Sequence, residues 1–254
     1  MDNLLISQVG KVAVLELNQP PANFFDKELL GAIHDTVRDL TSGDQCRAVV
    51  LCSAGKHFCA GANFSEGGLG EARVAWSREL YETAITLFEL ELPIVAAVQG
   101  SAVGGGLGLA CAADFRVAGP STRFHANFAS LGFHHGFGMS ITLPRIIGEQ
   151  AAANLLLTAR RVTGEEAHRI GLVDRLVADE AIRDEAMALA QQIAAQAPIA
   201  VQSMRKTLRG DLAARVKESL AHELVEQSAH WSTEDCAAGI AANLRRETAE
   251  FHAR

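Results

Sequence analysis

The chain has 254 residues, 48% of them hydrophobic and 21% charged, which is typical of a globular protein with a full core. Its formal net charge of −7 and its single Tyr and two Trp argue against nucleic acid or an anionic membrane as the main partner. Five cysteines without a C-x-x-C pair indicate reduced thiols and favour a cytoplasmic localisation.

Strands and helices are predicted to alternate over the first part of the chain, where apolar residues change between a period of two and a period near 3.6. Asp26 suits the N-cap of the first helix, and the apolar run at residues 48–52 is typical of a strand buried on both faces. In chain order, the patterns predict strands at 4–9 and 11–17, a helix at 26–40, a strand at 48–52, a glycine-rich loop at 55–70, a helix at 71–90 and a strand at 94–98.

Helices are predicted to fill the last third of the chain. After the glycine turn at residues 100–108, the patterns predict a buried helix to residue 113, strands at 114–118 and 123–126, helices at 139–147 and 149–157, a helix start at Thr163, a strand at 173–177, and helices from Asp179 onward with breaks at Pro198 and Gly210. This order predicts an α/β core with a helical C-terminal region. The repeated strand, strand, helix order favours a winding arrangement over a doubly wound sheet.

The glycine turn G-S-A-V-G-G-G-L-G at residues 100–108 is the first candidate for a functional feature. Adjacent glycines cost backbone entropy, so they indicate a close backbone approach or a positive φ. Here they open a predicted helix, whose free N–H groups suit an anion or a developing oxyanion. Close packing of helix against strand is an alternative. A dinucleotide fingerprint is excluded because Leu109 fills its last glycine position.

Two motifs in order carry a resemblance to a known family. G-K-H-F-C-A-G-A-N at residues 55–63 is followed by A-V-Q-G-S-A-V-G-G-G at 97–106, and together they resemble the crotonase (enoyl-CoA hydratase/isomerase) superfamily. The resemblance continues in L-P-R-I-I-G at 143–148 and A-x-x-x-G-L-V at 167–173, and covers about residues 4–250. It implies a crotonase-like spiral of strand-strand-helix units at residues 1–195 and a C-terminal helical trimerisation region at 196–254. It also implies a homotrimer or a dimer of trimers.

The resemblance implies a site for an acyl-CoA thioester. The backbone N–H groups of Ala62 and Gly105 match the two donors that hold the thioester carbonyl and stabilise an enolate. Ala22, Lys56 and Ala60 match segments that line CoA. No cofactor is implied beyond CoA, which is part of the substrate, and no metal ligand set is present in the sequence.

The sequence departs from the family pattern where water is added to an alkene. The two hydratase glutamates match Gly108 and Phe128, and neither residue moves a proton. Phe128 therefore counts as a substrate-binding residue here, and standard enoyl-CoA hydration is not expected. An Asp that other branches place near Gly136 is also absent.

The pair His134-His135 stands beside that position and supplies candidates for the acid or base. Histidine titrates near neutral pH, and His135 is the favoured base, with a structural histidine pair as the alternative. His125 and His57 are second candidates. Cys59, Glu66 and Glu71 are better explained as a small buried residue and two solvated carboxylates. Six phenylalanines are consistent with an apolar acyl pocket or with core packing: Phe24, Phe25, Phe64, Phe128, Phe133 and Phe137.

The leading hypothesis is therefore an acyl-CoA lyase or isomerase that forms an enolate, with the reaction left open. A C–C bond hydrolase of cyclic diketones is one alternative within the same fold. A non-catalytic CoA-binding protein is the other, because the loss of both glutamates is what such a protein would show.

Overall fold

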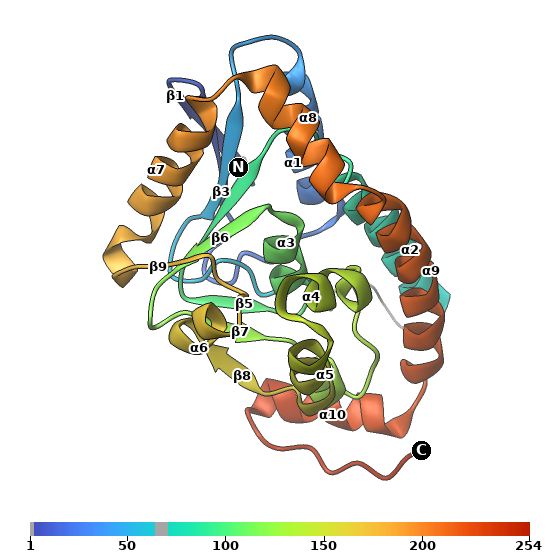
Figure 1. The fold of residues 1–254 in the computed structure, drawn as a ribbon. Helices are drawn as coiled ribbons and strands as arrows, with labels where there is room; N and C mark the ends of the chain where they lie inside the picture. The colour runs from blue at the N-terminus through green and yellow to red at the C-terminus, as the bar shows by residue number, and fades with distance from the viewer. Residues whose placement is uncertain (1–2, 64–70) are drawn as a thin grey trace.

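The computed structural model describes residues 3–63 and 71–254, and its central feature is a six-stranded sheet (Figure 1). The strands lie in the order β1-β2-β3-β4-β6-β9, with β1 antiparallel to β2 and the other neighbours parallel. Their bounds are β1 Leu4–Val9, β2 Val12–Leu17, β3 Ala48–Ser53, β4 Ile94–Val98, β6 Phe115–Ala118 and β9 Arg175–Leu176. The predicted alternation of strands and helices is confirmed.

Helices cover both faces of this sheet. On one face, α7 (Ile182–Ala194) packs its apolar residues against side chains such as Val50 and Val95. On the other face, α1 (Lys27–Thr41), α2 (Glu71–Thr86) and α3 (Gly105–Ala112) share a larger core with residues such as Leu51. All six residues of β3 are buried, as its continuous apolar run predicts.

A second sheet has three short strands in the order β5-β7-β8. They are β5 Ser101–Val103, β7 Arg123–His125 and β8 Arg161–Thr163. Only β7 was expected from the sequence. Three-residue strands inside a glycine turn or beside paired arginines carry too few alternating residues to give a periodic signal.

The C-terminal part is helical, as predicted. It contains α8 (Pro198–Arg209), α9 (Leu212–His230) and α10 (Glu234–Arg245), preceded by α4 (Met139–Ile147), α5 (Glu149–Thr158) and α6 (Gly164–Arg169). The helix expected at residues 71–90 ends at Thr86 because residues 87–89 turn. The division of the chain at residue 195 stays a prediction. Among the described residues, no helix has the length and hydropathy to cross a membrane.

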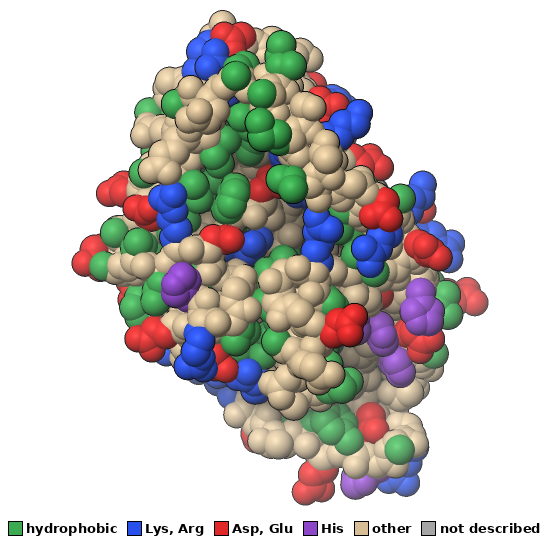
Figure 2. All heavy atoms as spheres, viewed as in Figure 1, with side chains coloured by type: hydrophobic (Ala, Val, Ile, Leu, Met, Phe, Trp, Pro, Cys, Tyr) green, Lys and Arg blue, Asp and Glu red, His purple; other side chains and the backbone are tan. Residues whose placement is uncertain are grey.

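An apolar hollow of about 500 Å³ lies among α4, α7 and α8. Figure 2 shows hydrophobic side chains gathered on this face, with Lys and Arg side chains below them. Leu189, Ile193, Met204 and Leu208 are among its lining residues. Leu208 is 75% exposed, so α8 presents an apolar surface here.

Candidate functional site

Two backbone segments meet at the N-terminus of α3. Gly61 has φ +91°, and a Cβ atom on it would lie 3.1 Å from the Gly105 nitrogen. A Cβ atom on Gly105 would lie 2.6 Å from the Phe25 ring. Gly61 therefore suits the close approach of the loop to the helix, whereas a side chain at Gly105 would collide with the Phe25 ring.

Neighbouring strand pairing fixes the loop beside the helix. Residue 62 forms a parallel bridge with Phe25, and Cys59 forms one with Ala102 of β5. The Phe25 N–H donates to the Gly61 carbonyl at 2.9 Å. In the part of the chain that the structure describes, neither the Ala62 N–H nor the Gly105 N–H donates to a protein acceptor. The Ala62 N–H in the loop and the Gly105 N–H in the first turn of α3 are thus two donors without an acceptor among the described residues, and the positive end of the helix dipole lies behind Gly105.

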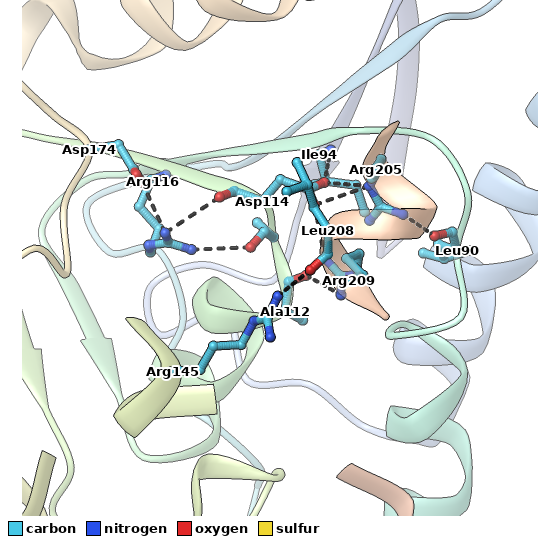
Figure 3. Close-up of polar contacts among 11 residues, drawn as sticks. Leu90, Ile94, Ala112, Asp114, Arg116, Arg145, Asp174, Arg205, Leu208 and Arg209 are labelled. Atoms are coloured by element: carbon cyan, nitrogen blue, oxygen red, sulfur yellow. Dashed lines mark hydrogen bonds and ion pairs between the residues drawn. The ribbon is translucent and has the colours of Figure 1, made fainter. Parts of the chain in front are cut away.

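The opposite end of α3 is held by arginines (Figure 3). Arg209 donates to the carbonyl of Ala112, the last helical residue, and to Asp114 Oδ1 at 2.9 Å. Arg116 donates to the carbonyl of Ala113 at 3.1 Å. Arg205 contacts both oxygens of Asp114. Cations at a helix C-terminus stabilise it, so this cluster anchors the helix whose other end provides the Gly105 N–H.

An outer cavity of about 630 Å³ opens on one side of Ala62 and Gly105. The exposed face of the three-stranded sheet forms one wall, because alternate residues of β5, β7 and β8 point to it while Ala102, Phe124 and Val162 are buried. Residues on this wall are Ser101, Val103, Arg123, His125 and Arg161. Among the described lining residues none is acidic, so the outer cavity favours an anionic ligand.

An inner cavity of about 30 Å³ lies on the other side of the same backbone groups. The two cavities share Ala62, Gly105 and Phe128 as wall residues. Aromatic rings surround most of the inner cavity, contributed by Phe25, Trp76, Phe128, Phe137 and Trp231. A carbonyl between the two N–H groups would thus have a large space with basic residues in its wall on one side and a small space lined largely by aromatic rings on the other.

Gly108 and Phe128, the two positions that match the hydratase glutamates, are both closely packed against phenylalanine side chains. A Cβ atom on Gly108 would lie 2.6 Å from the Phe137 Cβ atom. Phe137 itself has φ +62°, a strained conformation for a bulky residue. Phe128 is 5% exposed and packs edge-on against Phe133 at 5.8 Å between ring centroids.

Polar side chains also reach the inner cavity. The Tyr81 hydroxyl donates to Gln227 Oε1 at 2.8 Å, and Gln227 Nε2 donates to the His134 carbonyl at 2.9 Å. Burial raises the pKa of Tyr81, and the nearby Glu223 charge adds to the increase. Tyr81 therefore stays protonated and acts as a neutral hydrogen-bonding group.

His134 and His135 are not among the lining residues of either cavity. Their rings stack at 4.1 Å, and His135 Nε2 lies 2.8 Å from Ser140 Oγ. Burial, and then the proximity of His134, lower the pKa of His135 to about 4. The imidazole is therefore neutral at pH 7. Its role as a base stays a prediction, since the structure places the ring beside Ser140.

A buried carboxylate supports the same loop. Glu223 is fully buried and accepts hydrogen bonds from the N–H groups of Gly138 and Ser140, at 2.9 and 3.0 Å. It therefore caps the N-terminus of α4. Burial raises the pKa of Glu223, against which the hydrogen bonds of Ser140, Gly138 and Ser219 act.

Of the other residues predicted to line CoA, only one lies in the wall of the outer cavity. Ala60 lines the outer cavity, whereas Ala22 and Lys56 are not among its lining residues. The Ala22 carbonyl accepts from the Ala60 N–H at 2.9 Å and so supports the loop. The predicted CoA-binding roles of these residues stay predictions.

The remaining titratable candidates, His125, Cys59, His57 and Glu71, differ in their burial and in their contacts. His125 lines the outer cavity, and its Nε2 donates to the Ala159 carbonyl at 2.8 Å. Cys59 is fully buried, and burial raises its pKa to about 12, which fits the expected small buried residue. The Nδ1 atom of His57 is buried without a partner among the described residues, and Glu71 is exposed. Glu66 and Phe64 lie outside the described residues.

Two further expectations concern cysteine and metal. All five cysteines are free and buried: Cys46, Cys52, Cys59, Cys111 and Cys236. The described ranges contain no group of three or more His, Cys, Asp or Glu side chains arranged to hold a metal ion.

Sequence reasoning missed the polar residues of the inner cavity, which are Ser77, Tyr81, Gln227 and Trp231. They come from α2 and from α9 with the residue after it, so no local motif joins them. Spacing of four residues between Ser77 and Tyr81 puts both on one face of α2, but an amphipathic helix gives the same signal. Arg123 and Arg161 were missed because the pairing of β7 with β8, which brings them to one wall, leaves no local signal in the sequence.

Comparison with known proteins gives consistent matches over the whole chain. A family model described as "Enoyl-CoA hydratase/isomerase" matches residues 8–254. The short-chain-enoyl-CoA hydratase of Clostridium acetobutylicum is 31% identical over 256 residues, covering 98% of this chain and 97% of that protein. The crotonyl-CoA hydratase of Syntrophomonas wolfei is 30% identical, with 98% of both chains covered.

Solved structures agree with the fold. The crystal structure of an enoyl-CoA hydratase/isomerase from Pseudoalteromonas atlantica T6c superimposes with a TM-score of 0.87 at 28% sequence identity, covering 99% of this chain and 100% of that one. The structure of Pseudomonas aeruginosa DspI gives a TM-score of 0.79 at 28% identity, covering 99% of this chain and 98% of that one. The predicted spiral α/β fold with a helical C-terminal region is confirmed.

Proposed function

The chain belongs to the enoyl-CoA hydratase/isomerase family, and on this basis we propose that it binds an acyl-CoA thioester with the carbonyl oxygen between the N–H groups of Ala62 and Gly105. The observation that carries the proposal is the position of these free donors in the wall shared by the two cavities. The CoA part then lies in the outer cavity and the acyl group in the inner one.

The proposed chemistry is formation of an enolate at the α-carbon. Two preorganised N–H donors stabilise the negative charge that develops on the thioester oxygen, and removal of one such donor typically costs about 3–4 kcal/mol of barrier. Gly108 and Phe128 support a reaction other than two-glutamate hydration, because neither position carries a carboxylate. His135 stays the proposed base, with a neutral imidazole at pH 7.

The binding step is tested with ligands, which leaves the fold untouched. Butyryl-CoA is compared with S-butyl-CoA, a thioether that lacks the carbonyl oxygen, by isothermal titration calorimetry. Two hydrogen bonds of about 1 kcal/mol each predict at least tenfold tighter binding of the thioester. Equal dissociation constants for butyryl-CoA and S-butyl-CoA would contradict the proposal that Ala62 and Gly105 bind the thioester carbonyl.

The chemical step is tested by exchange of the α-protons of butyryl-CoA in D₂O, followed by NMR. Enzyme-dependent exchange is expected, and His135→Asn should slow it at least tenfold. Binding without exchange would instead support a non-catalytic CoA-binding protein. Crotonyl-CoA hydration at a rate typical of enzymes, a kcat near 10 s⁻¹ or above in order of magnitude, would contradict the argument from Gly108 and Phe128.

A homotrimer or dimer of trimers is also proposed. Exposed apolar side chains on the C-terminal helices support self-association, among them Leu208 on α8, Val225 on α9 and Leu244 on α10, which is 79% exposed. Sedimentation equilibrium at micromolar concentration should give a mass of three or six chains, and a monomer would contradict it. The cytoplasmic localisation stays a prediction, which the five free thiols support.

A further inference from the structure

The loop before α4 is bonded to α9 through the main chain of one residue. The His134 N–H donates to His230 Nδ1 at 3.3 Å, and the His134 carbonyl accepts from Gln227 Nε2 at 2.9 Å. Gln227 and His230 are three residues apart on α9 and therefore lie on the same face of the helix. The two hydrogen bonds together hold residue 134 on this face.

The first of these hydrogen bonds depends on the protonation state of His230. A backbone N–H only donates, so His230 Nδ1 accepts with its lone pair and the imidazole is neutral. A protonated imidazole carries hydrogen on both nitrogens, and Nδ1 then presents a second donor to the His134 N–H. Imidazole side chains in general titrate between about pH 5 and 8, so mild acid breaks this bond and leaves the bond from Gln227.

Three further imidazoles lie around this contact. The His134 ring stacks on His135 at 4.1 Å and lies 6.2 Å from His222 and 6.4 Å from His230, measured between ring centroids. Positive charges at these separations repel one another. Burial, and then the proximity of His134, lower the pKa of His135 to about 4. Release of the loop exposes His135 to solvent and lets it take up a proton, so acid favours the released state further.

The carboxylates of α9 give little compensation for this charge. Glu226 Oε1 lies 3.9 Å from His222 Nε2, and both side chains are exposed. Glu223 is fully buried, and its two oxygens accept from the N–H groups of Gly138 and Ser140. It is therefore directed at the N-terminus of α4.

The other elements packed near this end of α9 also lack a counter-charge for the contact. On α2, Tyr81 has a raised pKa and stays neutral, and Arg73 is a cation. On α10, Glu234 pairs with Arg254, and Asp235 accepts from the N–H groups of residues 252 and 253. Within the described ranges, no carboxylate pairs with the imidazole of residue 134 or 230. A proton gained there is therefore not neutralised.

The residues after His134 form part of the inner cavity, since Gly136 and Phe137 line it together with Trp231, the residue after His230. We propose that the contact between His134 and His230 is an acid-sensitive switch. With neutral imidazoles it holds residues 134–137 on α9 and keeps this wall of the inner cavity in place. Protonation of His230 releases the segment and opens the cavity, whichever ligand the cavity binds.

The two tryptophans of the chain, Trp76 and Trp231, report this opening because both line the inner cavity. The bimolecular constant for quenching of their fluorescence by acrylamide, corrected for lifetime, should increase at least about twofold between pH 7.5 and pH 5.5. His230→Asn offers an amide oxygen that does not titrate in place of Nδ1, and should keep the pH 7.5 value throughout. His230→Leu offers no acceptor and should show the higher value already at pH 7.5.

His252→Asn is the matched control at an exposed position of the C-terminal segment, and should follow the wild type. A wild-type quenching constant that does not change with pH, or the same increase in His230→Asn, would overturn the switch. So would a loss of far-ultraviolet circular dichroism over the same interval, because it would show unfolding of the whole chain and not release of one segment. If His230→Leu does not fold, the comparison of His230→Asn with the wild type still decides.

Discussion

Phe137 occupies the space that a side chain at residue 108 would need, because a Cβ atom on Gly108 would lie 2.6 Å from the Phe137 Cβ atom. The Phe137 ring also packs at 5.3 Å from Phe25 and at 6.4 Å from Phe88, measured between ring centroids. The glycine at residue 108 and the aromatic wall of the inner cavity are therefore coupled through Phe137. Any side chain at residue 108 requires residue 137 to move, because the clash begins at the Phe137 Cβ atom.

This packing predicts that Gly108→Ala destabilises the protein. Overpacking typically costs about 1–3 kcal/mol, which outweighs the helix propensity that alanine adds. Gly31→Ala is the matched control, because the nearest atom to a Cβ there is 3.9 Å away in helix α1, and it should be neutral or stabilising. Urea unfolding gives both free energies. Equal stability of Gly108→Ala and the wild type would contradict the packing argument.

The Asp114 cluster predicts a large loss of stability on removal of one charge. Asp114→Asn leaves the buried Arg205 and the partly buried Arg209 without their counter-charge, which should cost about 3–5 kcal/mol in the free energy of unfolding. The exposed pair of Lys27 and Glu79 is the comparison, and Glu79→Gln should leave the free energy of unfolding nearly unchanged. Similar losses in the two variants would show that the cluster does not anchor the fold.

The lowered pKa of His135 predicts that the protein loses stability in mild acid. Its folded pKa of about 4 lies below the ordinary 6.5, so below pH 6.5 the unfolded chain binds a proton that the folded chain does not. This destabilisation begins near pH 6.5 and is complete near pH 4. Between pH 7 and pH 5 it amounts to about 2 kcal/mol, from about 1.4 kcal/mol for each pKa unit.

Urea unfolding at pH 7, 6 and 5 measures this slope. His135→Gln should lose less stability over this interval than the wild type, by about that amount. The exposed His252 provides the control, and His252→Gln should keep the wild-type slope. Parallel slopes for His135→Gln and the wild type would rule out His135 as the source.

The volume of the inner cavity predicts a preference for short acyl groups. Butyryl-CoA should bind at least ten times more tightly than octanoyl-CoA, because the longer chain does not fit within about 30 Å³. Phe128→Ala removes a ring that lines both cavities and should reduce the ratio of the octanoyl-CoA to the butyryl-CoA dissociation constant. Phe115→Ala, on the partly exposed end of β6, should not change it. Tighter binding of octanoyl-CoA by the wild-type protein would contradict the assignment of this cavity to the acyl group.

The basic wall of the outer cavity predicts a contact with the phosphates of CoA. Arg161→Gln should weaken butyryl-CoA binding about fivefold. A hydrogen bond to a charged group contributes about 1.5–3 kcal/mol, and exposure of Arg161 to solvent reduces this contribution to about 1 kcal/mol. Binding of S-butyryl-pantetheine, which lacks phosphate, should change less than twofold. Arg160→Gln is the control, since Arg160 pairs with Glu166 and is not a lining residue. Equal losses for both ligands would exclude a phosphate contact.

Local sequence patterns predicted most elements of the fold, because their signals are local. Asp26 caps α1 through a bond from the Leu29 N–H at 2.7 Å, as an N-cap Asp does. Thr163 likewise accepts from the Glu166 N–H. The strands β5 and β8 escaped prediction because three residues give no periodicity, and they exist through pairing with β7.

By itself, the sequence determined that a run of glycines opens a helix at residue 105 and that residues 108 and 128 carry no carboxylate, because both follow from the residue types alone. Only the tertiary structure decided what surrounds the free N–H groups of Ala62 and Gly105. Phe137 packs over Gly108, and Ser77 and Trp231 line the same cavity, although these residues lie far apart in the chain. Such contacts depend on how α2, α9 and the loop before α4 pack together, and no local pattern encodes that packing.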